Sequence, residues 1–425
     1  MKTASTSQSK YTAFGIALCV GLIYMIMYML RKPFTGSTYE GMQWFGLDYK
    51  TTLIIAQVIG YASSKFMGIS TIPAMRGDQR IKWLVLLFGT AIFSLCGFWL
   101  FPPRWGPFWM LINGLPLGMV WGVVFKYCEG RKLTEVLTIV LASNFIISSG
   151  LAKSFSRYLL DKGFDQMQVP FLIALFCLPL LGVLLYGLTK IPEPNAEDIR
   201  LRKKRVPMTA RDRRIFFNAH KYIIFGFILM YALLSVLRDI RDNFAIEVWS
   251  GLVGAKSPAF FTWVELPATI VCLISIGFLY KIKDNNKALS VMTSLMAYCM
   301  LFLMASSLIF SLTRSLPMIW MVATGITLFI PYILMNGIVF DRYIAVHDSG
   351  GNGGYLMYMC DAFGYAVSVL VLISKNIWSD QVTWENFYVV LCVLFGLGVS
   401  VICLWLLAQC KSEKVAPNLS FRPLR

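Results

Sequence analysis

The chain has 425 residues, of which 57% are hydrophobic and 14% charged, and its formal net charge is +17. Soluble globular chains carry about 25% charged residues, so this composition argues against a soluble protein. The two histidines and the cysteines, which form no C-x-x-C pair, argue against a histidine metal centre and a disulfide framework. There is no Walker-type phosphate loop and no nucleophile–base constellation. We therefore expect neither an enzyme nor an ATP-driven pump, and no cofactor or metal.

Apolar blocks long enough to cross a bilayer as helices recur along the chain. Backbone groups in lipid must bond within their own segment, so each block predicts a helix rather than an open strand. In the fourth block Gly114, Gly118 and Gly122 repeat at a small-xxx-small spacing, which predicts close helix packing. The twelve predicted spans are 12–30, 51–75, 82–101, 106–127, 134–156, 167–189, 221–247, 258–280, 288–312, 316–340, 355–374 and 385–410.

A polar, basic stretch separates the first six blocks from the last six. Two six-helix bundles joined in this way resemble the major facilitator layout, which implies a substrate site near the bilayer midplane between the halves. Lysine and arginine concentrate in alternate connections, which predicts both termini in the cytoplasm and a multi-pass protein of the cell inner membrane. This bias explains the basic run 202–205 as part of a cytoplasmic connection, so binding of nucleic acid need not be invoked. We predict an N-terminal bundle (1–190), a linker (191–220), a C-terminal bundle (221–410) and a tail (411–425).

The most informative residues are charges at membrane depth. A charge at the centre of a span costs about 2.5–3.5 kcal/mol on insertion scales, so it is usually paired or faces a water-filled cavity. Arg238 and Asp242 are i,i+4 neighbours that can neutralise each other, or an anion can displace the carboxylate. Arginine and lysine in the spans suit an anionic substrate. The predicted substrate-binding residues are Arg31, Lys65, Arg238, Arg241, Tyr28, Tyr61 and Tyr358, and the predicted coupling or ion-pair residues are Glu265, Asp361 and Asp242.

Two motifs resemble a known family. Tyr28-x-x-Arg31-Lys32-x-Phe34 is similar to the Y-x-x-R-K-x-F run of the organophosphate:phosphate antiporters, and Gly60-Tyr61-Ala62-Ser63-Ser64-Lys65-Phe66-Met67-Gly68 resembles their second span. The resemblance implies that one arginine from span one and one from span seven clamp a phosphate, with the span-two lysine nearby. The implied counterparts are Arg31, Lys65 and either Arg238 or Arg241.

Three functions remain open. The first is a secondary transporter of a small organic anion, with an organophosphate exchanged for phosphate as one candidate. The second is a proton-coupled symporter that uses Glu265 or Asp361 as the proton carrier. The third is a transporter-like sensor that signals through the linker or tail. In each case the expected partners are a small solute and the lipid bilayer, with no nucleic acid, and we expect a monomer.

Overall fold

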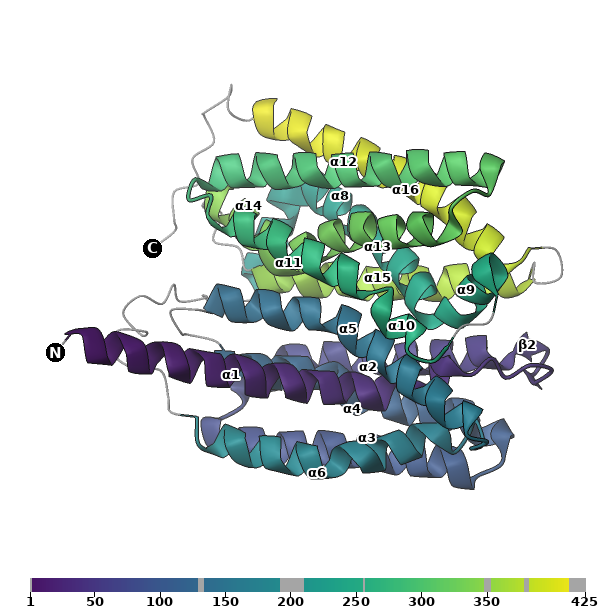
Figure 1. Cartoon of the computed structure of the whole chain (residues 1–425). Coiled ribbons are helices and arrows are strands. Elements are labelled where there is room, and N and C mark those ends of the chain that lie inside the picture. The colour runs from purple at the N-terminus through teal and green to yellow at the C-terminus, as the bar shows by residue number, and fades with distance from the viewer. Residues whose placement is uncertain are drawn as a thin grey trace. The chain divides into compact units, whose positions relative to one another are not determined.

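The computed structural model describes residues 2–128, 134–191, 210–254, 257–347, 353–377 and 382–412 (Figure 1). Close contacts divide the chain into two compact units. Unit 1 consists of Met1–Lys203, Asp242–Thr269 and Val369–Gln381. Unit 2 consists of Lys204–Arg241, Ile270–Ser368 and Val382–Arg425. The division predicted at 1–190, 191–220, 221–410 and 411–425 stays a prediction, and most of the linker and tail (192–209 and 413–425) lie outside the described residues.

Unit 1 is built from long helices, short helical turns and one small hairpin. Asp48 begins the second helix, because its side chain accepts a hydrogen bond from the Thr51 backbone N–H at 2.7 Å. The elements are α1 (Lys2–Arg31), η1 (Pro33–Gly36), β1 (Gln43–Trp44), β2 (Leu47–Asp48), α2 (Tyr49–Ala74), η2 (Gly77–Gln79), α3 (Arg80–Leu100), η3 (Pro103–Trp105), α4 (Gly106–Cys128), α5 (Thr134–Asp161), α6 (Val169–Thr189), α9 (Ala245–Val253) and α10 (Phe260–Trp263). Strands β1 and β2 pair antiparallel.

Unit 2 contains most of the remaining helices. Helix α8 bends at His220, whose backbone (φ −116°, ψ 16°) is not helical, and its last two residues belong to unit 1. A π-helical turn, η4, continues α13 into α14. The elements are α8 (Ala210–Asn243), α11 (Leu266–Tyr280), α12 (Asn285–Thr313), α13 (Pro317–Leu334), η4 (Met335–Val339), α14 (Phe340–His347), α15 (Gly353–Ile377) and α16 (Trp384–Ser412). Residues 266–269 of α11 and 369–377 of α15 also belong to unit 1.

Each predicted span falls on a helix. In the described part of the chain, nine helical stretches are long and apolar enough to cross a membrane, and a shorter apolar stretch lies in α1. Two boundaries differ from prediction. The seventh block ends earlier, since α8 stops at Asn243, and the eighth is split into α10 and α11 around Glu265. Pro267 lies in the first turn of α11, where a missing N–H does no harm. The predicted all-α polytopic membrane fold is confirmed.

Helices α2 and α4 pack at very close range. A Cβ added to Gly114 of α4 would lie 2.1 Å from the backbone oxygen of Gln57, and one added to Gly118 would lie 1.9 Å from the Ser64 hydroxyl oxygen. Any side chain at either position would push the helices apart. The small-residue spacing of the fourth span therefore has the packing role that we predicted, and it fixes the face of α2 that carries Tyr61.

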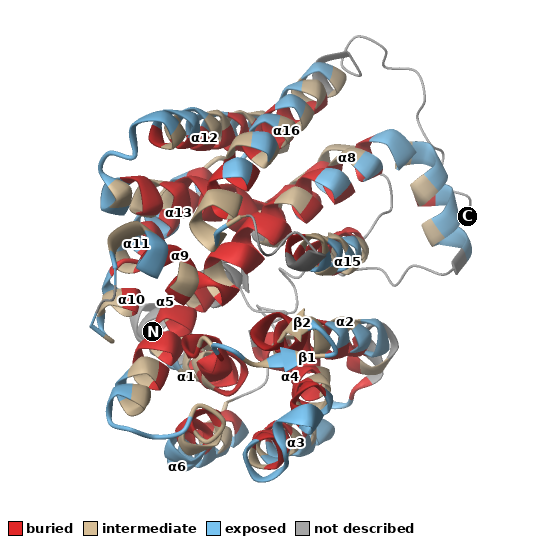
Figure 2. Ribbon diagram, turned by 90° about the vertical axis from the view of Figure 1, so that its right-hand side faces the viewer, coloured by how far each residue is buried: buried red, intermediate tan, exposed pale blue. Residues whose placement is uncertain are grey.

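Large apolar side chains are exposed along several helices. Phe93 of α3, Phe176 of α6, Phe302 of α12 and Leu404 of α16 all have more than half of their surface accessible. Figure 2 shows exposed residues running along these helices in pale blue. In water such surfaces would favour association, whereas in a bilayer they contact lipid chains at no cost.

Candidate substrate site

Two cations and an aromatic ring lie together between α1 and α2 in unit 1. The Arg31 guanidinium carbon lies 4.0 Å from the centroid of the Tyr61 ring, and Nζ of Lys65 lies 5.4 Å from the same centroid. Lys65 is also 5.7 Å from the Trp121 ring of α4. These distances are typical of cation–π interactions. The structure thus brings together three predicted residues, Arg31, Tyr61 and Lys65, which we call the cationic cluster.

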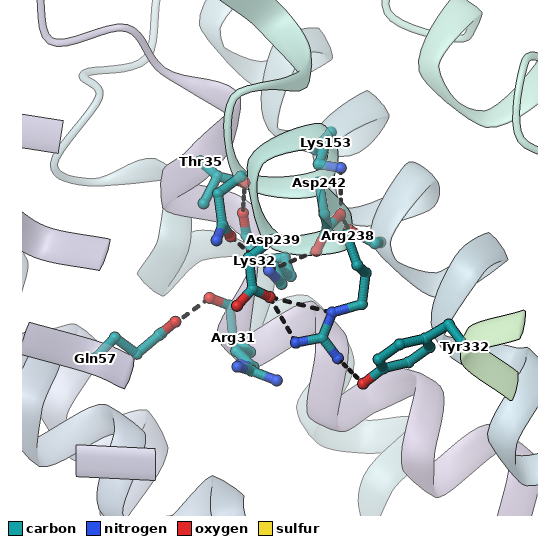
Figure 3. Close-up of polar contacts among 11 residues, drawn as sticks. Arg31, Lys32, Thr35, Gln57, Lys153, Arg238, Asp239, Asp242 and Tyr332 are labelled. Carbon is teal, nitrogen blue, oxygen red and sulfur yellow. Dashed lines mark hydrogen bonds and ion pairs between the residues drawn. The ribbon is translucent and has the colours of Figure 1, made fainter. Parts of the chain in front are cut away.

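Buried amides hold the end of α1 beside this cluster. The Gln57 side chain donates one hydrogen bond to the Arg31 backbone oxygen at 3.0 Å and another to Oδ1 of Asn113 at 2.8 Å (Figure 3 draws the first). Asn113 in turn donates to the Ser94 hydroxyl oxygen at 3.1 Å. Because these groups are buried and hydrogen-bonded, they fix the position of the Arg31 backbone. Tyr28, one turn earlier on α1, packs edge-on against Tyr24.

Asp242 is held by two lysines of unit 1. Its Oδ2 lies 2.5 Å from Nζ of Lys32, and its Oδ1 lies 2.6 Å from Nζ of Lys153, as Figure 3 shows. The Ser149 hydroxyl donates to the same Oδ1. We call Asp242, Lys32 and Lys153 the lysine clamp. Asp242 is therefore an ion-pair residue, but its partners are lysines distant in the sequence rather than Arg238, the i,i+4 neighbour that spacing offered as one alternative.

A second ion pair of unit 1 joins Lys50 of α2 to Glu247 of α9, with 2.5 Å between Nζ and Oε1. Lys50 also donates to the Thr35 backbone oxygen at 2.9 Å. Helix α9 lies between candidate spans. Burial raises the pKa of the Glu247 carboxyl, and the charge of Lys50 opposes this rise without cancelling it.

Arg238 and Arg241 have different surroundings in unit 2. The Arg238 guanidinium donates to Oδ1 of Asp239 at 2.5 and 3.1 Å and to the Tyr332 hydroxyl (Figure 3). Arg241 is fully buried, donates to the Met321 backbone oxygen at 2.8 Å, and lies where a Cβ on Gly325 would be. Arg241 is thus built into the contact with α13. Of the two alternatives, Arg238 is the better candidate for a binding residue.

Asp361 of α15 belongs to a hydrogen-bonded chain in unit 2. It accepts a hydrogen bond from the Tyr231 hydroxyl, which lies 3.3 Å from the Tyr332 hydroxyl and 3.0 Å from Oδ1 of Asn336. Since Tyr332 also accepts from Arg238, hydroxyl groups connect the buried carboxylate to the arginine. Asn336 lies in the π-helical turn η4, and such turns occur frequently at functional sites.

Two further predicted residues, Glu265 and Tyr358, lie on other helical segments. Glu265 is buried between α10 and α11 in unit 1, and its backbone oxygen accepts hydrogen bonds from the backbone N–H and hydroxyl of Thr269 at 3.1 and 2.9 Å. Tyr358 is half-buried on α15, one turn before Asp361. Within the described ranges, histidine, cysteine and acidic side chains form no group of three that could hold a metal ion.

Comparison with known proteins identifies the family. The family model described as "Family of unknown function (DUF5690)" matches residues 33–411. The chain belongs to this family. A search of curated proteins found no match for this DUF5690 protein.

Solved transporter structures share the fold of this DUF5690 protein. The crystal structure of the nucleoside transporter NupG is 14% identical, with 93% of this chain and 99% of NupG covered and a TM-score of 0.56. A single-site mutant of NupG is 12% identical over the same shares of the two chains, with a TM-score of 0.60. The D-xylose-proton symporter is 14% identical, with 92% and 97% covered and a TM-score of 0.60. At these identities the likeness establishes the fold, which is the major facilitator fold.

Several polar residues of this DUF5690 protein were not predicted as site residues. Tyr231 lies two turns before Arg238 on α8, so helical spacing alone could have pointed to it. Tyr332 and Asn336 are spaced i,i+4, next to a proline inside a span. The sequence offers no signal for Asn113, which stands alone in an apolar block and gains its role from contacts with α2 and α3.

Proposed function

We propose that the protein is a secondary active transporter that moves a small organic anion by alternating access. The observation that carries the proposal is the cationic cluster, in which Arg31 and Lys65 lie at one aromatic ring of a polytopic membrane protein. Charges are retained inside membrane bundles mainly where they act on a substrate or ion. The nucleoside transporter and the D-xylose-proton symporter with the same fold move solutes, as their names indicate, which supports transport over sensing.

The chemistry of the cluster favours an anion as substrate. A guanidinium presents paired N–H donors that match carboxylate or phosphate oxygens, and a lysine adds a point charge. The similarity of the Arg31 and Lys65 motifs to those of the organophosphate:phosphate antiporters adds an organophosphate, exchanged for phosphate, as the specific candidate. We propose that the protein works as a monomer in the inner membrane with both termini in the cytoplasm.

A thermal-shift screen of the purified protein tests the substrate class. The panel contains inorganic phosphate, sugar phosphates, carboxylates and nucleotides, and each charged compound is paired with its neutral parent sugar or nucleoside. We expect one class of anion to raise the melting temperature and its neutral parent to have no effect. Stabilisation by a neutral sugar or nucleoside equal to that by its phosphate would contradict an anion site.

The hydrogen-bonded chain at Asp361 favours a second candidate, a proton-coupled symporter. This buried carboxylate accepts a hydrogen bond from the Tyr231 hydroxyl, and a carboxylate inside a membrane bundle is a candidate proton carrier. The chain Asp361–Tyr231–Tyr332–Arg238 would then let its protonation affect the position of Arg238.

Asp361→Asn separates the two candidates. The amide keeps an acceptor for the Tyr231 hydroxyl but cannot bind or release a proton. If transport is coupled to protons here, the variant should retain counterflow in proteoliposomes and lose accumulation driven by a pH gradient. Glu265→Gln is the parallel test, because Glu265 is the other predicted carrier. Accumulation that survives in both variants would rule out both carboxylates as the coupling group.

A further inference from the structure

The only two histidines of the chain lie against each other in unit 2. His220 belongs to α8 and His347 to α14, far apart in the sequence, yet their ring centroids are 5.8 Å apart with an interplanar angle of 79°. From the sequence, the two histidines argued only against a histidine metal centre. The fold therefore brings two half-exposed imidazoles into contact. They lie outside the residues proposed for transport, which indicates a separate role.

Tyr343 links the two imidazoles. Its hydroxyl lies 2.8 Å from Nδ1 of His220, and its backbone oxygen accepts a hydrogen bond from Nδ1 of His347 at 2.9 Å. Its ring also packs on His347, with 4.3 Å between centroids, and only 1% of the residue is exposed. The Phe216 ring also packs on His220, with 5.0 Å between centroids. His220, Tyr343 and His347 therefore form one packed cluster, which joins α8 to α14.

The joint lies at the bend of α8. His220 is the residue with non-helical backbone angles, so the segment 210–219 before it is an arm whose direction differs from the rest of the helix. On the other side, α14 is anchored to the start of α12, because Arg342 donates to Oδ1 of Asn285 at 2.6 Å. The histidine contact thus connects the arm to a fixed element.

We propose that His220, Tyr343 and His347 form a proton-responsive latch, which holds the arm 210–219 against α14 when the imidazoles are neutral and releases it when both are charged. Histidine is the side chain whose charge ordinarily changes between pH 5 and 8. Two charged imidazoles at this separation repel each other, so the closed latch binds fewer protons than the open one. By linkage, the closed state is then most stable at the higher pH and loses stability as the pH falls.

Charged groups around the latch also disfavour a second proton on the imidazole pair. Beyond Tyr343, the described groups near the latch that carry or can acquire charge come from both helices of the joint and from α15. They include the basic residues Arg213, Lys221 and Arg342, the acidic residues Asp212 and Asp341, and Tyr355, so the basic groups named outnumber the acidic ones. The side chain of Asp341 is directed toward Gly353, at the start of α15. A second proton on the imidazole pair therefore enters an environment that is already positive.

Histidine-selective NMR tests the contact directly. With only two histidines, a full-length protein labelled with ¹⁵N in the imidazoles and purified through a tag without histidine gives just two ring systems. Because the two rings lie in contact, we expect the titration curve of each imidazole to depend on the charge of the other. In His347→Gln the remaining imidazole should titrate in a single step. Two independent titrations in the wild type, with the His220 curve unchanged in His347→Gln, would overturn the proposal.

Amide hydrogen exchange tests the release of the arm. After correction for intrinsic rates, exchange of residues 211–219 in the wild type should be faster at pH 5.5 than at pH 7.5. Tyr343→Phe keeps both imidazoles but removes the hydroxyl, and it should raise exchange of the arm about two- to tenfold already at pH 7.5. Tyr222→Phe removes an exposed hydroxyl from the same helix and should change nothing.

These measurements do not depend on the proposed transport function. Equal corrected exchange of the arm at both pH values in the wild type would overturn the latch whatever the protein transports. Tyr343→Phe keeps the test decisive if a histidine variant fails to fold.

Discussion

Arg31→Lys should abolish the thermal stabilisation given by the transported anion and weaken its binding at least tenfold. The lysine keeps the charge but loses the planar group that lies over the Tyr61 ring and the paired donors that match two oxygens of one anion. Hydrogen bonds to charged groups contribute about 1.5–3 kcal/mol each, and a loss of about 1.4 kcal/mol is already tenfold in affinity. Titration calorimetry with the anion found by the screen measures the effect.

Arg157→Lys is the matched control. Arg157 is a half-exposed arginine of α5 that forms an i,i+4 pair with Asp161, with 3.4 Å between Nε and Oδ1. The substitution is chemically identical but lies outside the cationic cluster, so affinity should be unchanged. Equal binding by wild type and Arg31→Lys would show that the anion is held elsewhere.

Asp242→Asn should strongly destabilise the protein. The side chain is only 14% exposed, and each of its two lysine partners is only 4% exposed, so the amide leaves two buried positive charges without their counter-ion. Removing one partner of a buried ion pair typically costs about 3–5 kcal/mol in the free energy of unfolding, because the remaining charge is left uncompensated. A thermal unfolding curve of the purified variant, measured without substrate, gives the effect.

Asp78→Asn provides the comparison for this loss. Asp78 pairs with Arg76 at 3.6 Å, but their side chains are 71% and 78% exposed, and exposed pairs contribute little. Its unfolding temperature should match that of the wild type. A double variant, Asp242→Asn with Lys32→Met, should recover part of the loss because it removes one of the uncompensated charges. An unfolding temperature of Asp242→Asn equal to that of the wild type would show that the lysine clamp does not stabilise the fold.

Hydropathy was sufficient to predict the fold class. Each apolar block is long enough to satisfy its own backbone as a helix, and this property is local in the sequence. The sequence did not predict where α8 ends. The apolar pattern continues through Phe244 and Ala245, and only the backbone at Phe244 (φ −110°, ψ 27°) shows that one helix stops and another begins there. Hydropathy reports that a segment suits an apolar environment, but it does not report a change in backbone direction.

Part of the candidate site could likewise be predicted from the sequence, and part could not. Tyr61 and Lys65 share a face of α2 by simple spacing, and their contact follows from it. The partners of Asp242 could not be predicted, because Lys32 and Lys153 become its neighbours only through the tertiary fold. Sequence spacing offered Arg238 as the partner, and it gave no measure of how close a lysine on another helix would come.

Counterflow in proteoliposomes tests whether the protein moves an organic anion held by Arg31. Vesicles loaded with the unlabelled anion should take up labelled anion from outside when they contain the wild type. Vesicles with Arg157→Lys should do the same, and vesicles with Arg31→Lys should take up none above protein-free controls. Binding of the anion by the wild type without any counterflow, or full counterflow with Arg31→Lys, would contradict the account.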